Sequence, residues 1–143
     1  MLSRIDIEQQ FRQSIHCSQV VLMEWAGALG YDREEAARMA APFGGGMFRG
    51  DTCGAVAGAL VAVGMRYGHC RPGDTEGNAA MMTKVKAFQD AFLARHGSLT
   101  CRDLCGYDFS QPGQLEQAMA SGVLFRCCPD FVRSALEILD EIM

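Results

Sequence analysis

The stretch DTCGAVAGALVAVGMRY, residues 51–67, decides the fold because its composition predicts a helix packed closely on its neighbours. Asp51 or Thr52 can cap the start of this helix. Four glycines fall in pairs spaced four residues apart, and residues four apart share one helix face. The pairs are Gly54 with Gly58 and Gly64 with Gly68. A flat face of this kind predicts a central, buried helix.

Helical patterns precede this segment. Apolar residues at helical spacing predict a helix over 5–29, closed by Gly30, and the pattern is compatible with a break near His16. An N-terminal capping box predicts a second helix over 32–41. A loop over 43–50 that contains four glycines then leads into the central helix.

Helical patterns also follow the central segment. Apolar spacing predicts a long helix over 76–95, and short helical segments are expected at 101–105 and 115–119. The last helix is predicted to begin with Pro129 at its first helical position and to run to the end of the sequence. Strand-type alternation is absent, so the prediction is an all-α fold.

Length and composition favour one compact unit. The chain has 143 residues, of which 49% are hydrophobic, so we predict a single-domain helical bundle of about five main helices over 1–143. The net charge of −4 and the lack of a basic cluster argue against nucleic-acid binding. The longest uncharged stretch, 52–65, is shorter than the ~20 residues that span a bilayer. With a polar, charged N-terminal segment, we expect a cytoplasmic protein without a membrane span.

The chain is rich in cysteine. Seven are present: Cys17, Cys53, Cys70, Cys101, Cys105, Cys127 and Cys128. Thiols are kept reduced in the cytoplasm, so catalytic, sensing or metal-binding roles are favoured over structural disulfides. The sequence contains no C-x-x-C, which argues against a thioredoxin-type dithiol and against most zinc ribbons.

Three cysteines are expected at helix starts. Cys53 and Cys101 follow capping residues, and Cys128 directly precedes Pro129. A helix N-terminus stabilises a thiolate, which is both the nucleophilic and the metal-binding form of cysteine. Cys17 lies within a helix or at a break and would need a neighbour to activate it. The 44–50 loop could form an anion-binding nest beside Cys53, with Arg49 as a nearby positive charge.

The sequence gives weaker indications of the roles of the other three cysteines. Cys70 is interpreted as a small buried hydrophobe near a helix end. Cys105 shares a helix face with Cys101 if that segment is helical, so the pair could bind one metal, or Cys105 could fill an apolar position. Cys127 and Cys128 are adjacent, and separate roles are favoured over a strained disulfide between neighbours.

One short motif connects the chain to a known family. Residues 53–58, Cys-Gly-Ala-Val-Ala-Gly, form a CGAxxG motif, and residues 101–108 match a C-x-x-L-x-G-x-D pattern. With a cysteine upstream and another downstream, the chain resembles the C_GCAxxG_C_C family of redox-active proteins over nearly its whole length. The resemblance assigns the four family cysteines to Cys17, Cys53, Cys101 and Cys128, with Cys127 as the alternative for the last. It also implies an unidentified redox partner or a transporter-associated partner.

Three functional hypotheses follow. In the first, the four family cysteines converge and cycle between thiol and disulfide, with Cys53 as nucleophile, in a thiol-dependent oxidoreductase or electron-transfer protein. In the second, the same four residues bind an Fe–S cluster or a zinc ion. In the third, the chain is a small helical interaction protein with buried structural cysteines. The small-residue helix is compatible with packing inside a monomer or across a homodimer interface.

Overall fold

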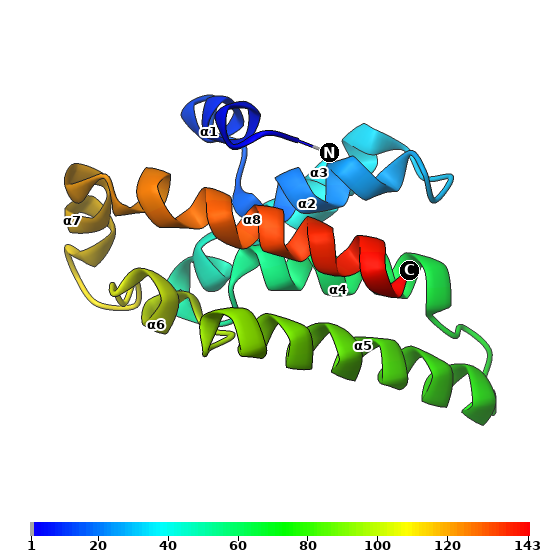
Figure 1. Ribbon diagram of the computed structural model, residues 1–143. Coiled ribbons are helices and arrows are strands. Elements are labelled where there is room, and N and C mark those ends of the chain that lie inside the picture. The colour runs from blue at the N-terminus through cyan, green and yellow to red at the C-terminus, as the bar shows by residue number, and fades with distance from the viewer. Residues whose placement is uncertain (1) are drawn as a thin grey trace.

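A computed structural model describes residues 2–143 as a bundle of helices (Figure 1). Within this range there are eight α-helices and no β-strand. They are α1 (Arg4–Arg12), α2 (Cys17–Ala26), α3 (Arg33–Ala40), α4 (Gly54–Tyr67), α5 (Thr75–His96), α6 (Cys101–Cys105), α7 (Gln114–Ser121) and α8 (Val123–Ile142). A 3₁₀ turn, η1 (Ala41–Phe43), and a π-type turn, η2 (Gly46–Gly50), connect α3 to α4. The all-α prediction is confirmed, with eight helices rather than about five.

The expected helix over 5–29 is divided into α1 and α2. The chain leaves the helical conformation at Ser14, whose φ of 65° is left-handed. His16 is then extended and caps α2 through the backbone. The break places Cys17 at the first position of α2. The sequence pattern had left open whether Cys17 lies within a helix or at a break. The short segments expected at 101–105 and 115–119 are present as α6 and within α7.

The last helix begins earlier than predicted. α8 starts at Val123, so Pro129 lies inside it instead of at its first position. Proline has no N–H to donate to the carbonyl four residues before it, here that of Phe125. Arg4 of α1 donates from Nη2 to the carbonyl oxygens of Phe125 at 3.0 Å and Arg126 at 2.6 Å. This external donor allows the helix to continue through the proline.

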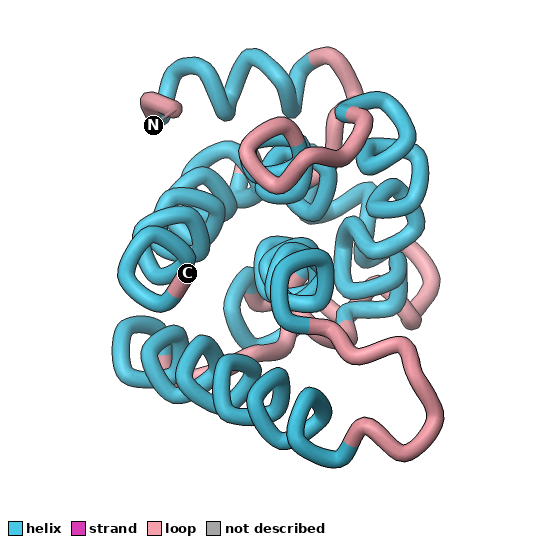
Figure 2. The backbone as a smooth tube through the Cα atoms, turned by 90° about the vertical axis from the view of Figure 1, so that its right-hand side faces the viewer, coloured by secondary structure: helices cyan, strands magenta, loops and turns pink. Residues whose placement is uncertain are grey.

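The central position predicted for the segment over 51–67 is found in α4. It packs against α2, α5 and α8. Figure 2 looks along the bundle, with α4 in the middle and the 68–74 loop joining it to α5. Its small side chains are buried, and the largest buried side chains around them include Phe88 and Phe92 of α5. The hydrophobic core therefore surrounds α4.

Glycine allows α2 to approach α4 closely. A Cβ added at Gly58 would lie 2.6 Å from the backbone oxygen of Ser18 on α2. The Ser18 hydroxyl in turn donates to the carbonyl of Ala40 at 2.7 Å, which ties the start of α2 to the end of α3. The glycines of the motif at 53–58 thus set the distance between α2 and α4.

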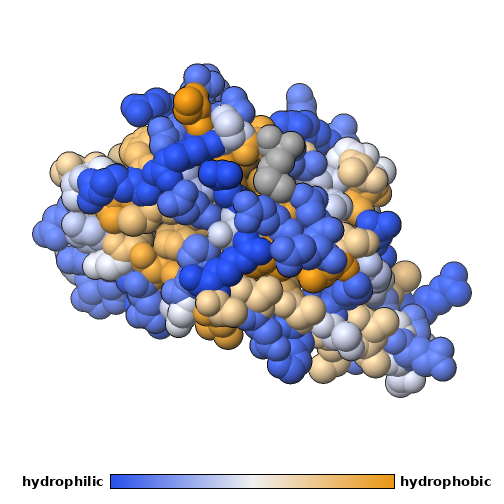
Figure 3. Space-filling model, in the orientation of Figure 1, coloured by the Kyte–Doolittle hydropathy of each residue, from blue (hydrophilic) through white to orange (hydrophobic). Residues whose placement is uncertain are grey.

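The surface is mixed in polarity. On the face of the molecule drawn in Figure 3, hydrophobic surface lies at the left, in the region of α6, α7 and the start of α8. In the described part of the chain, no helix combines the length and the apolar character needed to cross a membrane.

Candidate functional site

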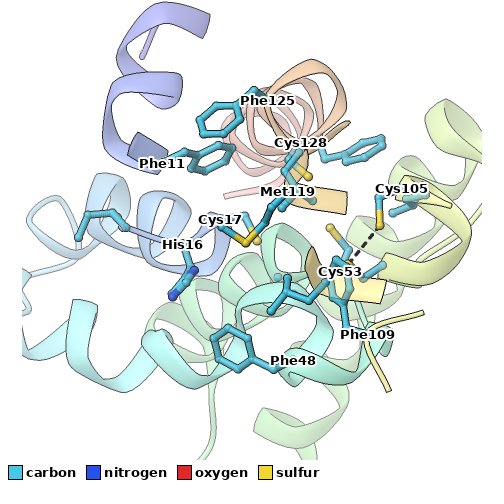
Figure 4. A pocket seen from close by; sticks show the side chains of 18 of the residues that line it. Phe11, His16, Cys17, Phe48, Cys53, Cys105, Phe109, Met119, Phe125 and Cys128 are labelled. Carbon is cyan, nitrogen blue, oxygen red and sulfur yellow. Dashed lines mark hydrogen bonds between the residues drawn. The ribbon is translucent and has the colours of Figure 1, made fainter. Parts of the chain in front are cut away.

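A pocket of about 320 Å³ lies where α2, α4, α6, α7 and α8 meet. Five of the seven cysteines line it. They are Cys17, Cys53, Cys101, Cys105 and Cys128. Figure 4 shows the four of these that it labels, from separate elements, around one space. The structure therefore brings together all four cysteines proposed from the sequence and adds Cys105.

The position of Cys17 depends on the glycine that follows Cys53. Cys53 is the N-cap of α4, directly before Gly54. A Cβ at Gly54 would overlap the sulfur of Cys17, so only glycine leaves room for that thiol. The motif at 53–58 is thus a packing device that holds the start of α2 against the start of α4, with one cysteine on each.

A short backbone bridge joins the second and third family cysteines. Thr52 and Thr100 form an isolated antiparallel bridge. The N–H of Cys53 donates to the carbonyl of Leu99 at 2.7 Å, and the N–H of Cys101 donates to the carbonyl of Asp51 at 2.6 Å. These bonds fix the starts of α4 and α6 side by side, although 48 residues of sequence separate the two cysteines.

Cys101 and Cys105 form a hydrogen-bonded pair of thiols. They are the first and last residues of α6, and their Sγ atoms are 3.8 Å apart. Both residues are buried, with 8% and 6% of their surface exposed. The i, i+4 spacing noted in the sequence is the signal that predicts this pairing.

Comparison with known proteins agrees with this cysteine arrangement. A family model described as "Putative redox-active protein (C_GCAxxG_C_C)" matches residues 15–142. The chain belongs to the C_GCAxxG_C_C family. No curated protein and no solved structure matches it.

In this C_GCAxxG_C_C protein the two thiols of α6 ionise differently. The pKa of Cys105 is lowered to about 6, first because its sulfur accepts a hydrogen bond from Cys101, which outweighs burial. The pKa of Cys101 is raised, first because it donates that hydrogen bond and then because it is buried. The hydrogen bond between the two sulfurs thus favours a thiolate on Cys105 over one on Cys101.

The remaining pocket thiols stay protonated. Burial raises the pKa of Cys53 to about 12, and it raises the pKa of Cys17 and of Cys128 as well. Backbone N–H groups, including that of Gly45, oppose the effect at Cys17 without reversing it. These pKa directions run against the expectation that helix starts favour the thiolates of Cys53, Cys101 and Cys128. Desolvation is the first cause at Cys53 and Cys128, and the hydrogen bond to Cys105 is the first cause at Cys101.

Two details of that expectation also differ in the structure. Cys128 lies in the second turn of α8 and not at a helix start, because α8 begins at Val123. The 44–50 loop places the backbone of Gly45 near Cys17 instead of Cys53. Arg49 is not among the residues that line the pocket.

The other two cysteines lie outside the pocket. Cys70 is exposed, which corrects its interpretation as a buried hydrophobe, because α4 ends before it and the 68–74 loop runs over the surface. Cys127 is partly buried but does not line the pocket. Of the two adjacent cysteines, Cys128 is thus the one that faces the other family cysteines.

Metal binding finds no support in the donor geometry. Within residues 2–143, no group of three or more His, Cys, Asp or Glu side chains is arranged to hold a metal ion. Thiolates suit zinc and Fe–S clusters chemically, but a tetrahedral zinc site with Zn–S bonds of about 2.3 Å needs its sulfurs within about 4 Å of one another. Among these cysteines, Cys101 and Cys105 meet that distance. The Fe–S or zinc hypothesis remains a prediction from the sequence.

Proposed function

We propose that this chain is a thiol–disulfide redox protein in which Cys101 and Cys105 form the reactive pair. The observation that carries the proposal is their 3.8 Å Sγ–Sγ distance inside a pocket lined by three further cysteines. The family's redox-active description supports the same chemistry. Cys105, as the thiolate, attacks the oxidant, and Cys101 then closes the disulfide.

A disulfide across α6 requires a local change of its backbone. Residues four apart in a helix have Cα atoms about 6 Å apart, within the usual 4.4–6.8 Å range for a disulfide. Their Cβ atoms are about 5–6 Å apart, whereas a disulfide needs about 3.5–4.5 Å, so side-chain rotation alone does not close the bond. α6 has five residues with Gly106 as its C-cap, so closure requires this short helix to open at one end.

The three other pocket cysteines have a supporting role in this proposal. Cys17, Cys53 and Cys128 are protonated in apolar surroundings, and a protonated thiol is a poor nucleophile. Transfer of the disulfide from the α6 pair to one of them by thiol exchange requires that cysteine to ionise first. This assigns the first attack to Cys105 instead of Cys53.

Mapping of the oxidised protein tests the proposal. Reduced protein is treated with one equivalent of diamide, and the peptides are then analysed by mass spectrometry without reduction. We expect a Cys101–Cys105 disulfide in the wild type, none in Cys105→Ser, and an unchanged yield in the control Cys127→Ser. If neither Cys101 nor Cys105 enters a disulfide, the proposal is wrong.

A further inference from the structure

Apart from its cysteines, the wall of the cysteine-lined pocket contains no acidic or strongly basic side chain. Of its nineteen lining residues, none is Asp, Glu, Lys or Arg. Apart from the cysteines, the polar side chains are Ser14 and His16. Burial lowers the pKa of His16, so its ring is neutral at pH 7. A pocket whose only charge is the Cys105 thiolate disfavours anions and suits a neutral ligand.

Aromatic rings line two sides of this pocket. Phe11 and Phe125 lie on one side and Phe48 and Phe109 on the other, as Figure 4 shows. Phe11 and Phe125 form an edge-to-face pair with centroids 6.4 Å apart. Facing aromatic walls favour a flat ring, because aromatic groups interact best in stacked or edge-to-face arrangements.

The turn that carries Phe48 is unusual. Met47 and Phe48 have φ values of 58° and 57°, a left-handed conformation that is rare for bulky residues. In this conformation the ring centroids of Phe48 and His16 are 5.2 Å apart. Phe48 has 45% of its surface exposed. Strain of this kind is retained where surrounding structure or function requires it. Here it places an aromatic ring in the pocket wall.

The size of the pocket limits the ligand. At about 320 Å³ it lies at the lower end of the range for small-molecule sites. Met119 of α7 also lines it, and 63% of its residue surface is exposed. A ligand of one or two rings would fill the cavity and cover such apolar surface.

We propose that the pocket binds a quinone, a flat, neutral acceptor of two electrons and two protons, next to the Cys101–Cys105 pair. This inference rests on the proposed function, because the dithiol supplies the electrons. A quinone fits the uncharged aromatic walls and remains neutral when reduced to the hydroquinone. His16 can hydrogen-bond a quinone oxygen from the wall.

The reaction balances with the groups present. The Cys105 thiolate adds to a ring carbon of the quinone, and the adduct oxygen takes the proton of Cys101. The Cys101 thiolate then attacks the sulfur of Cys105, which breaks the carbon–sulfur bond and releases the hydroquinone anion. Water supplies the second proton. One quinone is reduced and the two thiols are oxidised to one disulfide.

Anaerobic mixing of reduced protein with duroquinone tests the inference. Every ring carbon of this neutral quinone that is not a carbonyl carbon carries a methyl group, so permanent arylation of the cysteine sulfur is disfavoured. We expect loss of quinone absorbance with one Cys101–Cys105 disulfide formed per hydroquinone.

A pair of exposed methionines provides matched variants. Met119→Lys places a charge on the pocket wall, whereas Met39→Lys changes a residue of α3 that is 56% exposed and does not line the pocket. Met119→Lys is expected to slow oxidation by duroquinone about tenfold while oxidation by diamide changes less than about twofold. Met39→Lys is expected to change neither rate.

The two oxidants separate the possible failures. If diamide forms the α6 disulfide but duroquinone leaves the thiols reduced, the quinone inference is overturned and the proposed function stands. If neither oxidant forms it, both fail. Equal effects of Met119→Lys and Met39→Lys on the duroquinone rate would also overturn the inference.

Discussion

Among single residues, Cys105 of α6 illustrates how a hydrogen bond and burial change the pKa of a thiol in opposite directions. Cys101 and Cys105 are both buried, yet one hydrogen bond between them lowers the pKa of Cys105 to about 6. Burial without such a bond raises the pKa of Cys53 to about 12. The proposed function therefore assigns the first attack to Cys105, whose sulfur has a thiol donor beside it, and not to Cys53.

Alkylation of Cys105 is expected to depend on pH with a midpoint near 6. The thiolate is the nucleophile, so the rate rises as pH increases through the pKa of Cys105 and levels off above it. Cys53 is expected to stay nearly unlabelled from pH 5 to 8 because its pKa is about 12. The measurement is iodoacetamide labelling at several pH values, with each peptide quantified by mass spectrometry.

Cys101→Ala provides the control for this profile. It removes the hydrogen-bond donor while leaving Cys105 in an apolar setting, so the midpoint should move to higher pH. An unchanged midpoint would show that the Cys101 thiol does not set the pKa of Cys105.

The sequence predicted which four cysteines gather, but not which one is ionised. The family pattern assigned Cys17, Cys53, Cys101 and Cys128, and all four line the pocket. Their ionisation depends on desolvation by side chains from several helices, and no local pattern reports that quantity. The spacing of Cys105 from Cys101 indicated a shared helix face, but it left open whether Cys105 pairs with Cys101 or fills an apolar position.

At the level of helices, glycine positions on α4 determine how close α2 can come. Gly58→Ala is expected to destabilise the protein by about 1–3 kcal/mol, because the added methyl would lie 2.6 Å from the backbone oxygen of Ser18. Gly64→Ala, on the same helix with no atom within 4 Å, should instead stabilise it by about 0.5–1 kcal/mol. Urea unfolding measures both changes. A similar effect of the two substitutions would show that α2 and α4 are not in close contact.

The sequence also predicted most helices but missed the start of α8. A capping box indicated α3, a capping residue and small side chains indicated α4, and regular apolar spacing indicated α5, and all of these are local signals. The start of α8 was missed because Pro129 resembles a first helical residue. Inside the helix, the Phe125 carbonyl that Pro129 leaves free accepts a hydrogen bond from Arg4, which lies 125 residues earlier, and no local pattern reports such a contact.

In the whole molecule, α1 holds the pocket end of α8. It lies before the residues matched by the family model, which begin at position 15. Its Phe11 ring packs against Phe125 in the pocket wall. Its Arg4 donates to the carbonyl that Pro129 leaves free and forms an ion pair with Asp130 at 2.6 Å. The first helix and the last are thus joined at the edge of the candidate site.

This connection predicts a coupling between Arg4 and Pro129. Arg4→Ala is expected to lower the free energy of unfolding, because it leaves the Phe125 carbonyl without this donor. In a Pro129→Ala background the new N–H at position 129 can bond that carbonyl, so the same substitution should cost at least about 0.5 kcal/mol less. A double-mutant cycle by urea unfolding measures the difference.

Arg95 provides a matched comparison for this cycle. Its side chain is 32% exposed, against 35% for Arg4, and it also connects to α8, through Glu137 and Glu141. These bonds are to carboxylates and not to a carbonyl freed by proline, so the effects of Arg95→Ala and Pro129→Ala should be additive. If the Arg4 cycle is equally additive, the arginine does not compensate for the proline. The continuation of α8 through position 129 would then need another cause.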